Sequence, residues 1–176
     1  GTFRSIVKIK QNNIMKLTES KLREIIQEEI KSIRESVESL LTESTRSTIA
    51  IEDKSGKVHG TYVHSDGYLK GVGAVLKNSF LKADKVEKLL NLGKFGISYL
   101  EDSIEGGDGH TFGKPKKGET VFYGRDRREK NDMTSDFKDR DAFLSNHTEE
   151  FAYMFSIKDK KWYYNNPKVD NTWNEL

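Results

Sequence analysis

The chain has 176 residues, a formal net charge of +2 and no cysteine, with 33% charged and 34% hydrophobic residues. Its length suits one domain plus an appendage. The lack of cysteine excludes disulfides and thiolate metal sites and is compatible with a reducing compartment. No apolar run approaches the roughly 18–20 residues of a membrane span, and no signal-peptide pattern is present, so we expect a cytoplasmic protein without membrane contact. The balanced charge does not by itself imply nucleic acid.

The first fourteen residues have two interpretations. Gly1 resembles a scar left by tag cleavage, and Met15 opens a segment typical of a natural start, which would make residues 2–14 an upstream addition. The same segment nevertheless alternates apolar and polar residues from Phe3 to Ile9, as a β-strand does. Residues 1–14 are therefore either a scar with upstream sequence or a native strand.

An amphipathic helix is predicted within residues 15–43. Thr18 is placed to cap it, and apolar residues then recur at alternating spacings of four and three, which is the seam of a coiled coil. The seam residues are Ile26, Ile30, Ile33, Val37 and Leu40. A narrow seam favours one partner helix, so we predict a homo-oligomer through this helix. The alternative is a helix lying across its own domain.

A second domain is predicted over residues 44–176 and begins with strands. Segments 47–53 and 57–64 alternate apolar and polar residues on either side of a Lys-Ser-Gly turn, which predicts a hairpin. Apolar spacing then predicts helices at residues 69–81 and 84–93, the second capped by its first residue, an aspartate.

The remainder of this domain combines loops, one helix and a further hairpin. Residues 101–118 are rich in Gly, Asp and Lys and predict a loop, residues 120–124 predict a strand, and a polar stretch leads to a short helix at 136–146. Alternation over Phe151–Tyr164 predicts the clearest hairpin. This grouping predicts an α+β fold: a mainly antiparallel sheet with helices packed on one face.

The first candidate site is the His-Ser-Asp-Gly-Tyr segment at the end of a predicted strand. Side chains at strand ends often carry function, and His64 and Asp66 are close enough in sequence to share a proton or a ligand. The alternative is local: Asp66 caps the next helix and Gly67 supplies a positive φ. Gly71 and Gly73 lack the third glycine of a dinucleotide fingerprint and predict close helix packing. We expect no cofactor and no metal site.

The second candidate site is the basic segment, residues 114–130, whose seven basic and three acidic residues give a charge of +4. Its basic residues are Lys114, Lys116, Lys117, Arg125, Arg127, Arg128 and Lys130. Phe122 and Tyr123 lie among them, and interleaved basic and aromatic residues bind phosphates and stack on bases, which makes nucleic acid a candidate partner. Residues 131–150 carry −4, so the alternative is that the two segments neutralise each other.

Several motifs resemble those of small uncharacterised proteins of tailed bacteriophages, marine phages among them. They are Ser-Thr-Arg-Ser-x-Ile-x-Ile from Ser44, His-x-Asp-Gly-Tyr from His64, Gly-Val-Gly from Gly71, Phe-Tyr-Gly-Arg-Asp-Arg from Phe122 and the aromatic hairpin. The resemblance covers about residues 44–165. That group usually has Trp where this chain has Ser65 and Pro where it has Leu69, so a large surface aromatic is missing. The resemblance implies phage origin and the host-cell cytoplasm, and it transfers no activity.

Two functions are compatible with these patterns. The first is a non-enzymatic phage-type accessory protein that binds a host or phage macromolecule, because no nucleophile elbow, Walker motif or zinc-protease motif is present. The second is a small enzyme or a nucleotide- or phosphate-binding protein with a site formed by His64, Asp66, Tyr68 and Arg125, with Arg127 nearby. The second requires these side chains to meet in one pocket, within roughly 10 Å of one another.

Overall fold

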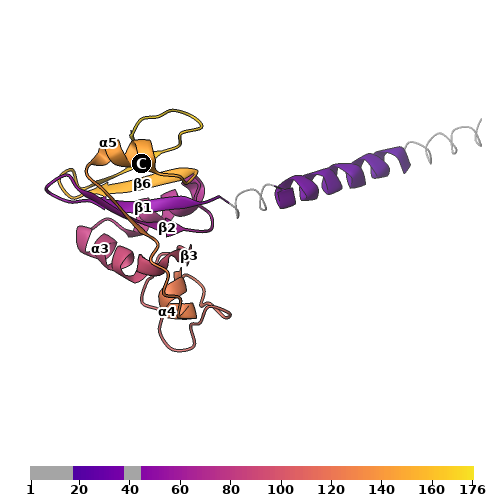
Figure 1. Cartoon of the computed structure of the whole chain (residues 1–176). Helices are drawn as coiled ribbons and strands as arrows, with labels where there is room; N and C mark the ends of the chain where they lie inside the picture. Colours follow the sequence, from indigo (N-terminus) through magenta and orange to yellow (C-terminus); the bar gives the residue numbers. More distant parts are fainter. Residues whose placement is uncertain (1–17, 38–44) are drawn as a thin grey trace, which may run out of the picture. The chain divides into compact units, whose positions relative to one another are not determined.

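The computed structural model describes residues 18–37 and 45–176, which fall into two units, 1–41 and 42–176 (Figure 1). In the first unit, residues 18–37 form one helix, as predicted for this segment. The alternatives for residues 1–14 and the seam residue Leu40 lie outside the described residues. Of the helices that the structure describes, none is long and apolar enough to cross a membrane.

Within its described residues, the second unit is built on one mixed sheet of eight strands. They are β1 (Ser47–Glu52), β2 (Val58–Val63), β3 (Ile97–Tyr99), β4 (Val121–Phe122), β5 (Thr134–Phe137), β6 (Phe151–Ser156), β7 (Lys161–Asn165) and β8 (Asn174–Glu175). Seven of them lie in the order β4-β3-β2-β1-β6-β7-β8, and β5 pairs with β2. The sheet is mostly antiparallel, as predicted, but β1–β6 and β2–β3 are parallel pairs.

Short helices connect these strands. They are a π-helical turn (Leu69–Gly73), α2 (Ala74–Ser79), α3 (Ala83–Leu92), a 3-10 turn (Gly93–Phe95), α4 (Tyr123–Arg127) and α5 (Arg140–Asn146). The single helix predicted at 69–81 is divided because Gly71 has a non-helical backbone (φ −94°, ψ −106°). Asp84 lies in the first turn of α3, whose N-cap position is Lys82, so the predicted aspartate cap is wrong.

The sheet buries both of its faces because β1 lies at its centre. Residues along a strand point alternately to the two faces, so Ile49 and Ile51 enter one core cluster and Ala50 enters the other. Tyr153 and Phe155 of β6 likewise share the cluster of Ile49. Both predicted hairpins are therefore confirmed as antiparallel pairs, β1 with β2 and β6 with β7, although β1 is buried at every position because both of its faces are covered.

Helices cover both faces of the sheet, which corrects the prediction of helices on one face. Apolar residues of α2 and α3 pack in the core cluster of Ile49, whereas Phe143 of α5 packs on the opposite face against Ala50, Ala152 and Met154. The small side chains of Ala50 and Ala152 leave room for the Phe143 ring. At the start of α5, Arg140 also pairs with the buried Glu52 at the end of β1.

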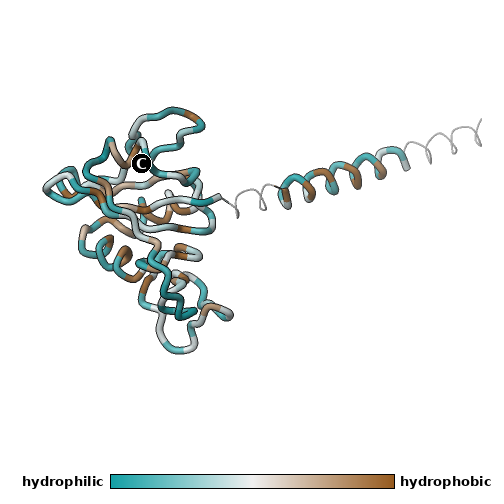
Figure 2. The backbone as a smooth tube through the Cα atoms, in the orientation of Figure 1, coloured by the Kyte–Doolittle hydropathy of each residue, from teal (hydrophilic) through white to brown (hydrophobic). Residues whose placement is uncertain are grey.

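Aromatic residues of the C-terminal hairpin, β6 and β7, contact several other segments within the larger core cluster. The Trp162 indole stacks edge-on against Phe155 and donates a 2.7 Å hydrogen bond to the Phe80 carbonyl. The fully buried Tyr153 donates through its hydroxyl to the Gly67 carbonyl at 2.8 Å. A Cβ on Gly73 would lie 3.2 Å from the Tyr153 ring, so the predicted close packing at this glycine is confirmed. Figure 2 shows the hydrophobic residues that these strands contribute.

Candidate functional site

The segment from His64 to Tyr68 leaves β2 beside β3, because the two strands run parallel with Val63 opposite Ile97. The His64 amide donates to the Ile97 carbonyl at 2.8 Å. The N-cap position of the next helix is Tyr68, without a side-chain cap, and it is Asp66 that has the positive φ of 56°. The roles predicted for Asp66 and Gly67 are therefore wrong.

Gly67 is needed instead for close backbone contact. A Cβ at this position would lie 2.7 Å from the Arg46 carbonyl carbon, and the Gly67 amide donates to the Thr45 carbonyl at 2.8 Å. The strand-end segment is thereby held against the residues that enter β1. This contact places Arg46 near the side chains at the end of β2.

A chain of hydrogen bonds fixes the His64 ring. Arg46 Nε donates to the Tyr62 hydroxyl at 3.1 Å, and that hydroxyl lies 2.8 Å from His64 Nδ1. The Tyr62 hydroxyl therefore accepts from Arg46, and in its bond with His64 Nδ1 the donor is set by the histidine tautomer. His64 Nε2 makes no hydrogen bond to any described residue.

The same histidine belongs to a row of rings contributed by three separate segments. We define the aromatic row as Tyr62, His64, Tyr123 and Phe112. Their ring centroids are 6.0, 6.4 and 5.7 Å apart in this order. Arg127 continues the row, because its guanidinium carbon lies 4.9 Å from the Phe112 ring centroid. All four rings are half-buried, whereas Arg46 and Arg127 at the two ends are exposed.

A cavity of about 420 Å³ lies beside the Phe112 end of the row. Ser65, Tyr99, Glu101, Phe112, Lys116 and Lys117 are among the residues that line it. Partial burial, followed by the charges of Asp66 and Glu101, raises the pKa of Tyr99 to about 12. Burial also raises the pKa of Glu101, together with the charges of Asp102 and Asp66. Tyr99 therefore stays a neutral phenol and is not an available base at neutral pH.

Arg125 lies in a different network, in which it closes the long loop between β3 and β4. Its guanidinium donates to the carbonyls of Ile104 and Thr120, both at 2.8 Å, and to the Asp126 carboxylate at 2.7 Å. It also lies over the Phe122 ring, 4.8 Å from the centroid. These bonds occupy its donors with groups of the loop itself, so Arg125 holds the fold rather than presenting a charge to a ligand.

His110 and Asp126 complete this internal network. The His110 and Asp126 side chains are 1% and 4% exposed, and His110 Nε2 lies 3.2 Å from Asp126 Oδ2. The Lys116 amide donates to His110 Nδ1 at 3.1 Å, so the ring proton is on Nε2 and points to Asp126. Burial raises the pKa of the Asp126 carboxyl, but hydrogen bonds from Arg125, from the Phe122 amide and from His110 outweigh it and leave this pKa below its usual value.

Of the four residues of the predicted shared site, His64, Asp66 and Tyr68 follow β2 and lie next to β3, whereas the Arg125 guanidinium bonds to the loop network. That the four side chains share one pocket stays a prediction. The sequence patterns did not predict Tyr62 and Tyr123 as neighbours of His64. The alternation of Tyr62 with His64 was the one available signal, because residues i and i+2 share a face of a strand.

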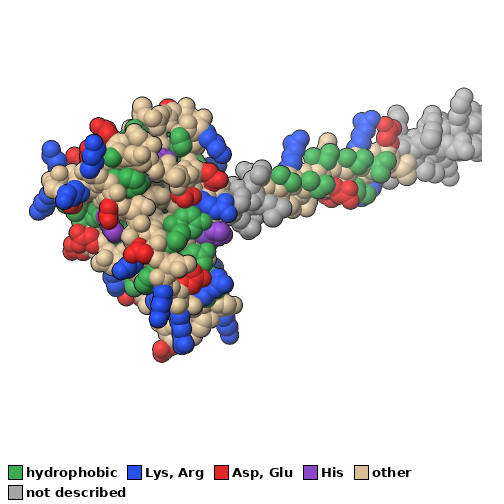
Figure 3. Space-filling view, viewed as in Figure 1, with side chains coloured by type: hydrophobic (Ala, Val, Ile, Leu, Met, Phe, Trp, Pro, Cys, Tyr) green, Lys and Arg blue, Asp and Glu red, His purple; other side chains and the backbone are tan. Residues whose placement is uncertain are grey.

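The basic segment is not neutralised by the acidic residues that follow it. Within the part of the chain that the structure describes, the acids of 131–150 pair with His59 and Lys94, not with this segment. Five exposed cations of the basic segment form no ion pair to any described residue: Lys114, Lys116, Lys117, Arg128 and Lys130. Figure 3 shows lysine and arginine side chains gathered at the end of the second unit where Figure 1 places α4.

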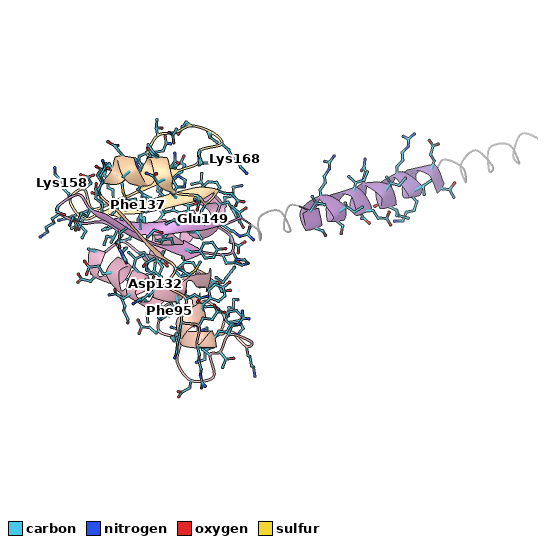
Figure 4. All side chains as sticks on the ribbon, in the orientation of Figure 1. Phe95, Asp132, Phe137, Glu149, Lys158 and Lys168 are labelled. Carbon is cyan, nitrogen blue, oxygen red and sulfur yellow. The ribbon has the colours of Figure 1, made fainter. Side chains whose placement is uncertain are left out.

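A second hollow, a groove of about 550 Å³, lies beside the Tyr62 end of the row, and Tyr62 is among the residues that line it. Figure 4 labels Asp132, Phe137 and Glu149, which line it between β5 and the end of α5. His147 also lines it, and its Nε2 bonds to Asn165 Oδ1 at 2.8 Å while its buried Nδ1 has no hydrogen-bond partner among the described residues. No group of three or more His, Asp or Glu in the described ranges would hold a metal ion.

The helix of the first unit presents most of its predicted seam to solvent. The exposed fractions of Ile26, Ile30, Ile33 and Val37 are 45%, 45%, 62% and 49%. Figure 3 shows hydrophobic side chains in a row along this helix, and Figure 2 shows that they recur along its length. Surface ion pairs, such as Arg23–Glu19 at 2.7 Å, lie elsewhere on the same helix.

Comparisons with protein-family models, with curated proteins and with solved structures gave no match. The geometry of these surfaces is therefore the basis for assigning a function.

Proposed function

We propose that the chain is a phage-type accessory protein that binds a host or phage macromolecule without catalysing a reaction, and that its N-terminal helix holds two or more copies together. The observation that carries the proposal is the exposed seam of Ile26, Ile30, Ile33 and Val37. Each such side chain contributes roughly 1.5–3 kcal/mol when it is fully buried. A helix of 20 residues is marginal alone in water, so burial of this seam stabilises it.

Charges beside the seam favour a second copy of the same helix as the partner. With Ile30 and Val37 at position a of the heptad and Ile26 and Ile33 at position d, Glu29 occupies position g and Arg34 the following position e. In parallel coiled coils these positions of neighbouring helices form ion pairs. Neither Glu29 nor Arg34 is in an ion pair with a described residue of its own chain, which leaves both for that role.

The seam allows two or more copies. Isoleucine at both a and d favours three or more strands, as in the heptad of Ile30 and Ile33, whereas Val37 at a followed by Leu40 at d is the pattern of a two-stranded coiled coil. We therefore propose a homodimer or a higher homo-oligomer, in which each body is presented more than once. Repeated presentation strengthens binding to a long or repetitive partner without any new contact.

A non-enzymatic role is supported by the state of Arg125, whose guanidinium donors are occupied by two loop carbonyls and by Asp126. The resemblance to phage proteins supports the host-cell cytoplasm as the place of action. The alternative, an enzyme or phosphate-binding protein, would need Arg125 to leave its loop network for a site shared with His64, Asp66 and Tyr68.

Light scattering on the full chain tests the assembly. We expect a dimer or a higher oligomer in the wild type and a monomer in the Ile30→Asp, Ile33→Asp double variant, because two carboxylates would be buried in the seam. The matched control is Lys31→Asp, Ser32→Asp, which adds two carboxylates off the seam and should keep the wild-type mass. A wild-type monomer at tens of micromolar would contradict the proposal.

A further inference from the structure

We propose that the aromatic row binds single-stranded nucleic acid, with bases stacked on its rings and phosphates held by the basic segment. The inference rests on the proposed binding function and names the class of partner. The sequence pattern suggested a contact through residues 114–130 alone, whereas the contact proposed here also includes the rings of the aromatic row, which come from three separate segments of the chain. Figure 3 shows exposed hydrophobic side chains and a histidine on the face that leads to the basic end.

The spacing of the rings suits unpaired bases. Neighbouring centroids in the row are 5.7–6.4 Å apart, whereas bases stacked in a duplex strand are about 3.4 Å apart. Bases that use successive rings must therefore be unstacked from one another, which a single strand allows and a duplex resists. Arg127 adds a guanidinium plane over Phe112, and such planes also stack on bases.

The row is held in place before any ligand binds. Gly96, with φ of 90°, leaves the space in which the Tyr123 ring lies, since a Cβ there would be 3.1 Å from that ring. The Tyr123 amide donates to the Gly96 carbonyl at 3.2 Å. Two residues further on, Arg125 fastens the chain to Ile104 and Thr120. Rings that are already ordered lose little conformational entropy on binding.

His64 supplies a polar contact in the middle of the row. Its Nδ1 is paired with the Tyr62 hydroxyl, whereas Nε2 has no hydrogen-bond partner among the described residues. According to the tautomer, Nε2 donates to base carbonyls and phosphate oxygens or accepts from base amino groups. Nε2 thus adds polar recognition to a row that otherwise offers the faces of its rings.

The charges around the row indicate where the phosphates lie. At the Tyr62 end, Arg46 is accompanied by two carboxylates: Glu150 accepts from the Arg46 amide at 2.7 Å, and Glu149 raises the pKa of Tyr62, after the larger effects of burial and of Arg46, which lowers it. At the Phe112 end, Lys116 and Lys117 line the same cavity as Phe112, and neither forms an ion pair with a described residue. We therefore place the phosphates at the Phe112 end.

Fluorescence anisotropy with the full chain and labelled twelve-nucleotide oligo(dT), oligo(rU) and a duplex of equal length tests the inference. We expect both single strands to bind and the duplex to bind at least about tenfold more weakly, because its bases are not free to stack on the row. Raising salt fourfold should weaken single-strand binding about 20- to 50-fold if three or four phosphates are contacted, at a slope of about 0.7 per phosphate. The two single strands distinguish DNA from RNA as the source.

Two variants with matched controls locate the contact. Phe112→Ala should weaken single-strand binding about 5- to 150-fold, the loss of one stacked base. Tyr163→Ala, which removes another half-buried ring paired with an arginine, should leave binding unchanged.

Lys116→Gln, Lys117→Gln should weaken binding and lower the salt slope by about 1.4 for two phosphate contacts, whereas Lys54→Gln, Lys158→Gln should change neither. Figure 4 shows Lys158, which lies in the turn between β6 and β7.

Three outcomes would overturn the inference: no single-strand binding by the wild type, equal binding of duplex and single strand, or equal effects of the row variants and their controls. The lysine pair lies on the surface, so it remains a test even if Phe112→Ala fails to fold. Light scattering on the same samples keeps the proposals separate. A multimer that binds no oligonucleotide overturns the nucleic-acid inference alone, whereas a monomer contradicts the assembly.

Discussion

The two units of this chain differ in how far their large hydrophobic side chains are buried. In the second unit, the large apolar residues of both sheet faces are buried, and Phe80, Phe122, Phe143 and Tyr153 are 0% exposed. In the first unit, the described helix leaves Leu22, Ile25 and the seam between 44% and 62% exposed. The second unit therefore has a core of its own, whereas the first needs a partner surface to bury its stripe.

The largest effect is expected in the core of the second unit. Phe155→Ala should lower the free energy of unfolding by about 3–5 kcal/mol, because Phe155 is 2% exposed and contacts the Trp162 ring edge-on. Urea denaturation measures the change. Leu81→Ala is the control, because Leu81 is 62% exposed and its truncation should cost less than about 0.5 kcal/mol. Equal costs for the two variants would show that the hairpin is not central to the core.

A comparison of Arg125 with Arg128 tests which arginines of the second unit stabilise its fold. Arg125→Met should cost about 2–3 kcal/mol, since it removes the cation paired with the buried Asp126 side chain and the donor to two loop carbonyls. Arg128→Met, at an exposed arginine without an ion pair among the described residues, should cost less than about 0.5 kcal/mol. Thermal melting of both variants measures this difference, and an unchanged Arg125→Met protein would contradict the structural role.

The helix of the first unit should lose its structure when the protein is diluted, because dissociation exposes its seam. This loss should be independent of unfolding of the second unit. Ile30→Ala should weaken association by about 1.5–3 kcal/mol per copy and leave the melting of the second unit unchanged. Far-ultraviolet circular dichroism over a dilution series follows the loss of helix. Ile25→Ala removes a side chain that is 44% exposed but lies off the seam, so it should have a smaller effect. A larger effect for Ile25→Ala would place the contact on another face of the helix.

The smallest effect is a pH dependence that arises in the loop network. Because the folded state lowers the pKa of Asp126, its ionised form stabilises the protein fully above the unfolded value of about 3.9. This contribution is lost as the pH falls through the lower folded value. The stability difference between wild type and Asp126→Asn should therefore be constant near neutral pH and shrink below about pH 4. A difference that grows in acid would contradict the assignment.

Local patterns in the sequence predict the two hairpins and α3, because alternation and helical spacing act within a few residues. They do not predict β5, whose Thr-Ser-Asp-Phe sequence has no apolar alternation and is a strand only because β2 offers an edge. The predicted helix at 136–146 is confirmed only from Arg140 onward, because residues 136 and 137 belong to β5.

The candidate surface shows the same limit. The segment from His64 to Tyr68 could be selected from sequence because its residue types are adjacent. Tyr123 and Phe112 reach His64 only through the parallel β2–β3 pair and the loop closed by Arg125. Arg125 and Arg127 look alike in sequence, and only the carbonyls that surround Arg125 separate a structural residue from an exposed one.

The parallel pairing of β1 with β6 has a consequence for folding. Ser47 lies opposite Phe151, so the central strand is completed by a partner about a hundred residues later. Each hairpin forms locally, but their union must close a long loop and is therefore slow. Until then, one long edge of β1 presents unpaired amides and carbonyls between apolar side chains, which is a template for aggregation. We therefore expect a nascent or truncated chain that lacks β6 to aggregate more readily than the whole chain.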